Sequence, residues 1–168
     1  HPGVVHDVIL DCVTQIGEQS TNPARTSLLT AGWPYTIPGM TVDRKCGSSE
    51  AAIHTAVGEI MSGAHDVVVA GGAENMTRVP MGGNRNVHGE PFGWKLQERF
   101  ELTSQGEAAE RLSDLYGFSR DDLDDFAIQS HKHAADAADS GYFNREIVPV
   151  STGDWRERGA DGQGAIFA

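Results

Sequence analysis

Cysteine is scarce in this sequence: only Cys12 and Cys46 occur among 168 residues. Because no Cys-x-x-Cys pair and no Cys/His spacing typical of zinc sites is present, we predict neither a metal site nor a disulfide framework. Long apolar runs are also missing, since none approaches the roughly 20 residues of a membrane-spanning helix. The first residues, His1-Pro2-Gly3, do not have the pattern of a signal peptide. These absences favour a protein of the reducing cytoplasm.

Basic residues are few as well. Lysine and arginine number 13 against 24 acidic residues, which gives a net charge of -11. Such a charge repels nucleic acids and anionic membrane surfaces, so neither is an expected partner. An anionic ligand would need a local cluster of bases. The length suffices for one domain with a core, and the lack of an initiating methionine suggests that the chain begins inside a longer protein.

The first 80 residues have the alternating pattern of an α/β fold. Strands are expected at 7–13, 40–43 and 66–70, the first and last of them buried. A helix is expected over 23–31, with an asparagine cap and a proline at its first position. A second helix should follow Cys46 and end at a glycine in position 63. Its expected apolar face consists of Ile53, Ala56, Val57, Ile60 and Met61. Strand, helix and strand at this spacing predict parallel strands joined by a right-handed crossover.

The pattern changes after residue 80. A glycine-rich loop is expected at 81–93, followed by a helix over 105–116. A sequence resembling a capping box opens a longer helix that ends near Ser140, and 146–150 could form a last strand. We therefore divide the chain into four segments: a nucleophile-bearing core (1–80), a substrate-covering loop region (81–118), a return helix and strand (119–150) and a flexible tail (151–168).

Cys46 is the most informative residue. It lies between the strand at 40–43 and the following helix, so its sulfur should sit near a helix N-terminus. There the helix dipole favours the thiolate and lowers the pKa of a thiol, which suits nucleophilic acyl chemistry. A buried, inert cysteine is the alternative, and Cys12, at the end of a buried strand, is interpreted as structural. Ser48 and Ser49 are expected to cap the helix.

Four stretches together resemble the thiolase family, the acetyl-CoA acetyltransferases and 3-ketoacyl-CoA thiolases. Residues 38–49, Pro-Gly-Met-Thr-Val-Asp-Arg-Lys-Cys-Gly-Ser-Ser, resemble the motif of its acylated cysteine. Residues 67–77 contain Gly-Gly-Ala-Glu-Asn-Met-Thr, similar to its second signature, and 7–19 and 119–150 match in order and spacing. The resemblance implies a thiolase-like mixed sheet with covering helices and a helical loop region. It also implies that this is one half of a two-half fold.

The resemblance implies a ping-pong acyl transfer between CoA thioesters, with acyl-CoA and acetyl-CoA as substrates and no bound cofactor. Cys46 would carry the acyl group, and its backbone N–H would form part of the oxyanion hole. Ser104 and Gln105 align roughly with residues that line the substrate pocket. Residues 74–76, Glu-Asn-Met, are expected to organise the loop near the nucleophile and not to take part in the chemistry. The full protein would be a homodimer or tetramer. Four bases near the 81–93 loop could meet CoA phosphates, although most such bases are merely solvated: Arg78, Arg85, Lys95 and Arg99.

The activating groups of the family are missing. The Gly-His-Pro, Cys-x-Gly and Asn-Glu-Ala-Phe-Ala motifs do not occur in this sequence. His54 lies about two helical turns beyond Cys46, and His131 and His133 fall in a polar helix, so none is expected to act as the base. We predict little turnover by the isolated chain. The alternative is a non-catalytic thiolase-like module for dimerisation or for partnering a separate chain, and an exposed apolar face should favour association.

Overall fold

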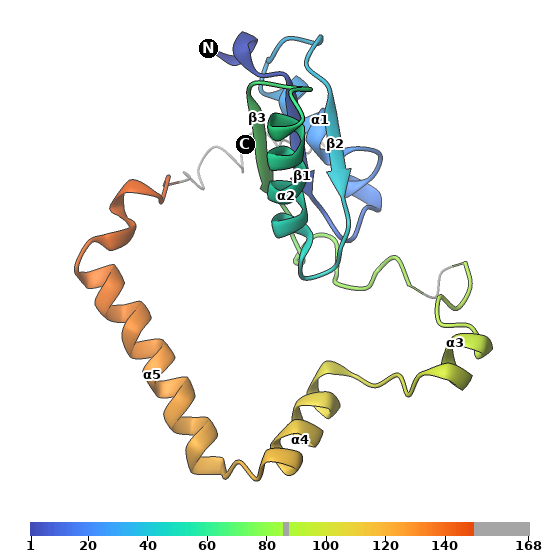
Figure 1. Ribbon diagram of the computed structural model, residues 1–168, viewed down its shortest axis with the longest axis vertical. Helices are drawn as coiled ribbons and strands as arrows, with labels where there is room; N and C mark the ends of the chain where they lie inside the picture. Colours follow the sequence, from blue (N-terminus) through green and yellow to red (C-terminus); the bar gives the residue numbers. More distant parts are fainter. Residues whose placement is uncertain (86–87, 150–168) are drawn as a thin grey trace. The chain divides into compact units, whose positions relative to one another are not determined.

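The computed structural model describes residues 1–85 and 88–149. The chain divides into two compact units, and the first boundary between them along the sequence falls between Pro91 and Phe92. The first unit is an α/β structure (Figure 1). Its elements are the 3₁₀ turns η1 (Pro2–Val4) and η2 (Gly17–Gln19), the strands β1 (Asp7–Asp11), β2 (Gly39–Val42) and β3 (Val68–Gly72), and the helices α1 (Pro23–Thr30) and α2 (Ser48–Met61).

The described sheet has three parallel strands in the order β2-β1-β3. The predicted strand, helix and strand unit is confirmed, because α2 connects β2 with β3 and all pairings are parallel. The two strands are not neighbours, however. β1 lies between them, with Asp11 opposite both Val42 and Gly72. The first strand of the chain is therefore the central strand of the described sheet. The segment that follows it, 11–19, starts between the ends of the strands that carry the two signature stretches, 38–49 and 67–77.

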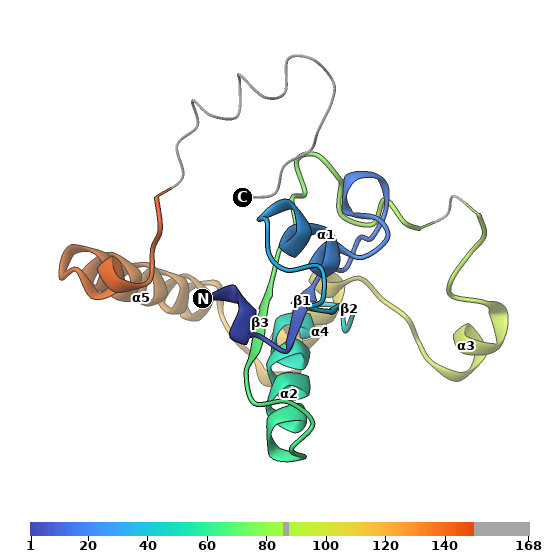
Figure 2. The same ribbon diagram turned by 90° about the horizontal axis from the view of Figure 1, so that it is seen from above.

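Alternate side chains of β1 supply the core on both faces of the sheet. Val8 packs with Ala24, Leu28 and Ile37 on the side of α1. On the other side Ile9, which is fully buried, packs with two alanines of α2, Ala52 and Ala56. Figure 2 shows α1 and α2 on opposite sides of the sheet. The unit thus has three layers, as expected for a parallel sheet that must be covered on both faces.

The start of α1 is fixed by a polar network with β2. Asn22 is the predicted cap: its Oδ1 accepts from the backbone N–H of Arg25 at 3.1 Å. The Asn22 amide also donates to the carbonyl of Gly39 at 2.7 Å, and the hydroxyl of Thr41 donates to Asn22 Oδ1 at 2.8 Å. One side chain therefore satisfies a helix end and joins it to the neighbouring strand.

The close approach of α1 and β2 requires glycine at position 39. A Cβ atom there would lie 2.9 Å from the backbone nitrogen of Arg25 and 3.1 Å from its Cα. We expect Gly39→Ala to lower the free energy of unfolding by about 1–3 kcal/mol, because backbone atoms of a packed helix must move. Urea denaturation of the full chain measures this loss. Gly58→Ala is the matched control, since no atom lies within 4 Å of its added Cβ. In helix α2 that change should be neutral or stabilising by up to about 1 kcal/mol; equal losses in both variants would contradict the argument.

The predicted apolar face of α2 is only partly buried. Ala51, Ala52 and Ala56 lie in the core. Of the predicted face only Ala56 is buried. Its four larger residues are exposed: Ile53 (53%), Val57 (46%), Ile60 (46%) and Met61 (82%). The helix itself is confirmed, but alanines make the contact with the sheet because they allow the closest approach. The aliphatic side chains lie on a neighbouring face.

Strand β3 differs from its prediction in two ways. It continues through Gly71 and Gly72, which pair with Leu10 and Asp11, rather than ending at Ala70. It is also not fully buried, since it lies at the edge of the described sheet and Val69 is 36% exposed. The continuous apolar run at 66–70 therefore predicts the strand correctly, but it does not predict how far the strand is buried.

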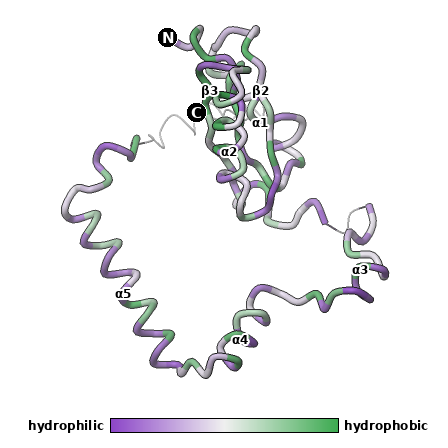
Figure 3. Tube along the Cα trace, in the orientation of Figure 1, coloured by the Kyte–Doolittle hydropathy of each residue, from purple (hydrophilic) through white to green (hydrophobic). Residues whose placement is uncertain are grey.

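The second unit is helical over its described part. It contains α3 (Trp94–Arg99), which was not predicted, α4 (Gln105–Tyr116), α5 (Arg120–Asp139) and the 3₁₀ turn η3 (Tyr142–Arg145). The capping box at the start of α5 is confirmed, with Ser119 and Asp122 bonded reciprocally. Hydrophobic and hydrophilic positions alternate along α4 and α5 (Figure 3).

The predicted strand at 146–150 is wrong for its described residues. Positions 146–149 lie in no strand, and Ile147 and Val148 are exposed. A strand needs a partner for its backbone groups, and Pro149 has no N–H to donate. The tail predicted at 151–168 lies outside the described residues. Within the described ranges, no helix has both the length and the apolar character that crossing a bilayer demands.

Candidate active site

The carboxyl ends of the three parallel strands meet at one edge of the sheet. β1 ends at Asp11, and its register partners Val42 and Gly72 end β2 and β3. Three connections leave this edge: the turn at 43–47, the segment 12–22 and the loop at 73–79. In parallel sheets this edge is where ligands bind, because loops of independent sequence meet there over a rigid base.

Cys46 lies in the turn between β2 and α2, two residues before the first helical residue. It is exposed, so the buried-cysteine alternative is wrong for this residue. Ser48 fixes the turn: its Oγ accepts from the N–H of Arg44 at 2.7 Å and donates to the carbonyl of Lys45 at 2.5 Å. Lys45 has a φ of +51°, a conformation that costs free energy in a residue with a side chain. The local backbone is thus held in a tight, defined shape.

The predicted capping role of Ser48 and Ser49 is wrong. The cap of α2 is Gly47, and it makes no side-chain capping bond. Ser48 is used by the turn, whereas the hydroxyl of Ser49 donates to Oδ2 of Asp11. This second bond ties the start of α2 to the end of the central strand.

The lysine next to Cys46 is paired within the turn. The ammonium group of Lys45 lies 2.6 Å from Oδ2 of Asp43, and the backbone N–H of Lys45 donates to Oδ1 at 2.9 Å. The side-chain hydrogen bond from Lys45 is the main reason that the pKa of Asp43 lies below its usual value. The lysine adjacent to Cys46 is therefore already engaged by a carboxylate.

Cys12 has the opposite environment to Cys46. It is fully buried, and its backbone N–H donates to the carbonyl of Val42 at 3.2 Å. Burial, followed by the negative charges of Glu74 and Asp11, raises the pKa of Cys12 to about 11. The structural interpretation of this cysteine agrees with its position in the core.

Gly72 leaves room for the carboxylate of Asp11. A Cβ at position 72 would lie 2.3 Å from Cγ of Asp11, the residue opposite it in the sheet. Burial, with a smaller effect of Glu74, raises the pKa of Asp11. The second glycine of the signature thus permits a polar side chain at the carboxyl edge, and that side chain in turn holds Ser49 beside the nucleophile turn.

Glu74 organises the loop after β3, as the sequence predicted for positions 74–76. Its carboxylate accepts from the backbone N–H of Thr14 at 2.8 Å and of Val13 at 3.2 Å. Burial raises the pKa of Glu74, but the hydrogen bonds from Thr14 and Val13 outweigh it and leave the pKa below its usual value. Buried Gln19 completes the connection, because its Oε1 accepts from the N–H of Asn75 at 2.7 Å while its Nε2 donates to the carbonyl of Thr14 at 3.0 Å.

Sequence reasoning missed two of these contacts. Neither the Asp11–Ser49 bond nor the position of Gln19 has a local signal, since the partners are 38 and 56 residues apart in the chain. The only available sign was indirect: a polar residue at the end of a strand and a glutamine between two signature stretches.

The predicted substrate-binding residues belong to the second unit. Ser104 caps α4, where its Oγ accepts from the N–H of Glu107 at 3.2 Å, and Gln105 is the first residue of that helix. Both are exposed, and their contact with substrate stays a prediction. His54 lies on α2 with its Nε2 3.8 Å from Oε1 of Glu50, and both side chains are largely exposed.

Among the bases suggested for CoA phosphates, Arg78 pairs with a carboxylate, and Lys95 and Arg99 lie over aromatic rings. Arg78 forms a two-pronged ion pair with Glu18, in which Nε donates to Oε2 at 2.6 Å. Lys95 lies over the ring of Trp94 and Arg99 over that of Phe100, within 5.4 Å of the ring centres. Arg78 would have to leave its carboxylate partner to bind a phosphate.

Comparison with known proteins gives a consistent result. The family described as thiolase, N-terminal domain, matches residues 1–161. Steroid 3-ketoacyl-CoA thiolase FadA6 of Mycobacterium tuberculosis is 40% identical over 161 residues, which cover 90% of this chain and 39% of that protein. A 3-ketoacyl-CoA thiolase of Saccharophagus degradans is 44% identical over 148 residues, covering 88% of this chain and 37% of that protein.

A solved structure agrees with these relatives. The crystal structure of the Bacillus anthracis acetyl-CoA acetyltransferase matches with a TM-score of 0.73 and 38% identity, covering 89% of this chain and 40% of that one. The chain therefore spans about two fifths of the length of the proteins it matches.

Proposed function

Because the chain belongs to the thiolase family, we propose that it is the nucleophile-bearing part of a thiolase-type acyltransferase that acts on CoA thioesters. The observation that carries this proposal is the exposed Cys46 in a tightly held turn before α2, at the carboxyl edge of a parallel sheet. A thiol at this place is open to a substrate, and the N-terminal end of a 14-residue helix favours negative charge beside it.

The chemistry follows from a thiolate at this position. The sulfur of Cys46 attacks the keto carbon of a 3-ketoacyl-CoA, and the backbone N–H of Cys46 stabilises the oxyanion. The bond between the keto carbon and the α-carbon then breaks, the α-carbon takes a proton, and acetyl-CoA leaves. The acyl group stays on Cys46 as a thioester until the thiol of a second CoA attacks it and restores the cysteine.

The proton transfers need groups that this sequence does not contain, since the Gly-His-Pro and Cys-x-Gly motifs are absent from its 168 residues. We infer that the remaining part of a thiolase supplies them and covers the exposed aliphatic face of α2, formed by Ile53, Val57 and Ile60. The same face favours a second candidate, a non-catalytic module that dimerises or binds a separate chain. Cytoplasmic location and homodimeric or tetrameric assembly remain predictions of the sequence.

Acylation of the cysteine distinguishes the two candidates. The full chain is incubated with acetyl-CoA, and its intact mass and peptide map are recorded over time. We expect one acetyl group per chain, attached to Cys46, because its thiolate displaces CoA from the thioester. Steady-state thiolysis should be absent, since the activating base is missing.

Two variants make the acylation test specific. Cys46→Ser should carry no acetyl thioester, whereas Cys12→Ser should be acylated at the unchanged rate because Cys12 is buried. Acylation that persists in Cys46→Ser would reject the acyl-carrier role. If neither the unsubstituted chain nor Cys12→Ser is acylated, the result would favour the non-catalytic module.

A further inference from the structure

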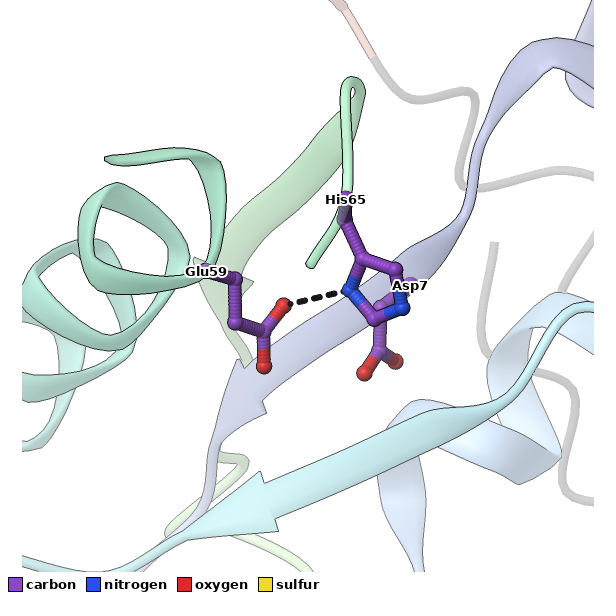
Figure 4. Close-up of side chains that lie close together, drawn as sticks. All are labelled: Asp7, Glu59 and His65. Atoms are coloured by element: carbon purple, nitrogen blue, oxygen red, sulfur yellow. Dashed lines mark hydrogen bonds and ion pairs between the residues drawn. The ribbon is translucent and has the colours of Figure 1, made fainter. Parts of the chain in front are cut away.

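Three potential metal ligands converge at the end of the first unit that lies away from Cys46. Asp7 begins β1, Glu59 lies in the last turn of α2, and His65 lies in the connection from α2 to β3. One ligand atom from each lies within 4.8 Å of the other two, and all three residues are partly buried. Figure 4 shows the three side chains gathered between the helix end and the first strand.

Existing contacts hold these side chains in place. Nδ1 of His65 lies 3.0 Å from Oε2 of Glu59. Oδ1 of Asp7 accepts from the N–H of Val8 at 2.7 Å. The connection itself is anchored, because the N–H groups of Ala64 and His65 donate to the carbonyl of Glu59. The three ligands therefore come from segments that these bonds hold together.

The charges favour a cation. In the described part of the chain, no lysine or arginine forms a salt bridge with Asp7 or Glu59. Two carboxylates thus lie close to one imidazole, with ligand atoms within 4.8 Å of one another, in a chain with a net charge of -11. Nearby His6, whose ring centre lies 5.9 Å from that of His65, is not a fourth ligand: its Nδ1 accepts from the N–H of Asp66 at 3.0 Å, so its proton is on Nε2.

The donor set indicates the kind of ion. One imidazole nitrogen and two carboxylate oxygens are ligands that Zn²⁺ accepts, with bonds of about 2.0–2.2 Å and water in the remaining position. Neighbouring ligands of a tetrahedral ion are then roughly 3.4 Å apart. The separation of 3.0 Å between His65 and Glu59 is close to this value, and a limit of 4.8 Å leaves only small movements for the third ligand.

We propose that Asp7, Glu59 and His65 bind a divalent transition-metal ion of the zinc class, which fastens the end of α2 to the start of the central strand. The site does not rest on the proposed acyl chemistry. Glu59 follows Cys46 by 13 residues, most of them in α2, which corresponds to about 20 Å along a helix. The ion therefore has a structural role and lies outside the carboxyl edge of the sheet.

Zinc binding to the full chain tests the proposal, with Cys46→Ser as the parent so that the exposed thiol does not bind the ion. Titration calorimetry should give one Zn²⁺ per chain. His65→Gln, Glu59→Gln and Asp7→Asn should each weaken binding about tenfold or more. The double variant Glu50→Gln/His54→Gln is the matched control, because it removes an exposed carboxylate and imidazole from the same helix. It should bind as the parent does.

A second measurement covers variants that fail to fold. In the Cys46→Ser parent with all three ligands intact, zinc should protect His65 from diethylpyrocarbonate, while the modification rate of His54 stays unchanged. Peptide mapping measures both rates. Equal weakening in the control variant, equal protection of both histidines, or no zinc bound to the parent would each overturn the site.

Discussion

Iodoacetamide is expected to alkylate Cys46 in the native chain at least about a hundredfold faster than Cys12. Cys46 is exposed in its turn, whereas Cys12 has no exposed surface. With a pKa of about 11, only about one Cys12 in a thousand carries a thiolate at pH 8, and the thiolate is the reactive form. Burial lowers its rate further, because the reagent must wait for an opening of the core.

Peptide mapping by mass spectrometry over a time course measures both rates in one sample. Cys12 serves as the internal control, and in concentrated denaturant the two cysteines should react at similar rates because their environments become equal. Cys46→Ser should leave the native chain almost unreactive. Comparable native rates for the two thiols would contradict the described burial of Cys12 and would remove the distinction on which the choice of nucleophile rests.

Local chemistry explains which elements could be predicted from the sequence. Asn22 and Pro23 at the start of α1 and the Ser119–Asp122 capping box of α5 act within one helical turn, so their pattern is complete in the sequence. The parallel direction of β2 and β3 also followed from the length of the connection between them, although each of them pairs with β1 and not with the other. These are properties of neighbouring residues, and they do not depend on the rest of the chain.

The arrangement across the sheet could not be predicted in the same way. That β1 lies between the strands flanking α2 depends on contacts between distant segments. The buried face of α2 consists of alanines because the helix approaches the sheet closely, a distance that periodicity does not encode. At 146–149 the residues favour a strand, but the structure places them in none.

The candidate site was predictable only where it depends on neighbouring residues. Cys46 could be selected from its place between a strand and a helix, because a turn is a local feature. The groups that hold the neighbouring loops could not: Asp11 reaches Ser49, and Glu74 reaches Val13 and Thr14 across about 60 residues. The glutamate of the second signature therefore has a positional role that becomes visible only in the folded chain.

Glu74→Gln is expected to lower the free energy of unfolding by about 2–3 kcal/mol at pH 7. The carboxylate accepts backbone N–H groups from both Val13 and Thr14, and hydrogen bonds to a charged group are worth about 1.5–3 kcal/mol. Glutamine keeps the shape but offers one oxygen, so its amide nitrogen would face an N–H donor. Urea denaturation measures the loss, and Glu110→Gln, on exposed α4, is the control expected to change little.

The pH dependence of this loss identifies the ionised carboxylate as its cause. The folded pKa of Glu74 lies below its usual value of 4.5, so the unfolded chain takes up the proton first as the pH falls. The stabilisation is fully present above about pH 4.5 and is lost as the pH falls through the folded pKa. The pKa of Asp11 is raised, so its effect on stability as the pH falls has the opposite sign. Its main cause is the burial of Asp11, which is the same in wild type and variant, so this effect largely cancels in the difference between them. The difference between wild type and Glu74→Gln should therefore shrink below about pH 4.5. A difference that stays constant down to pH 3 would mean that shape, not charge, holds the loop.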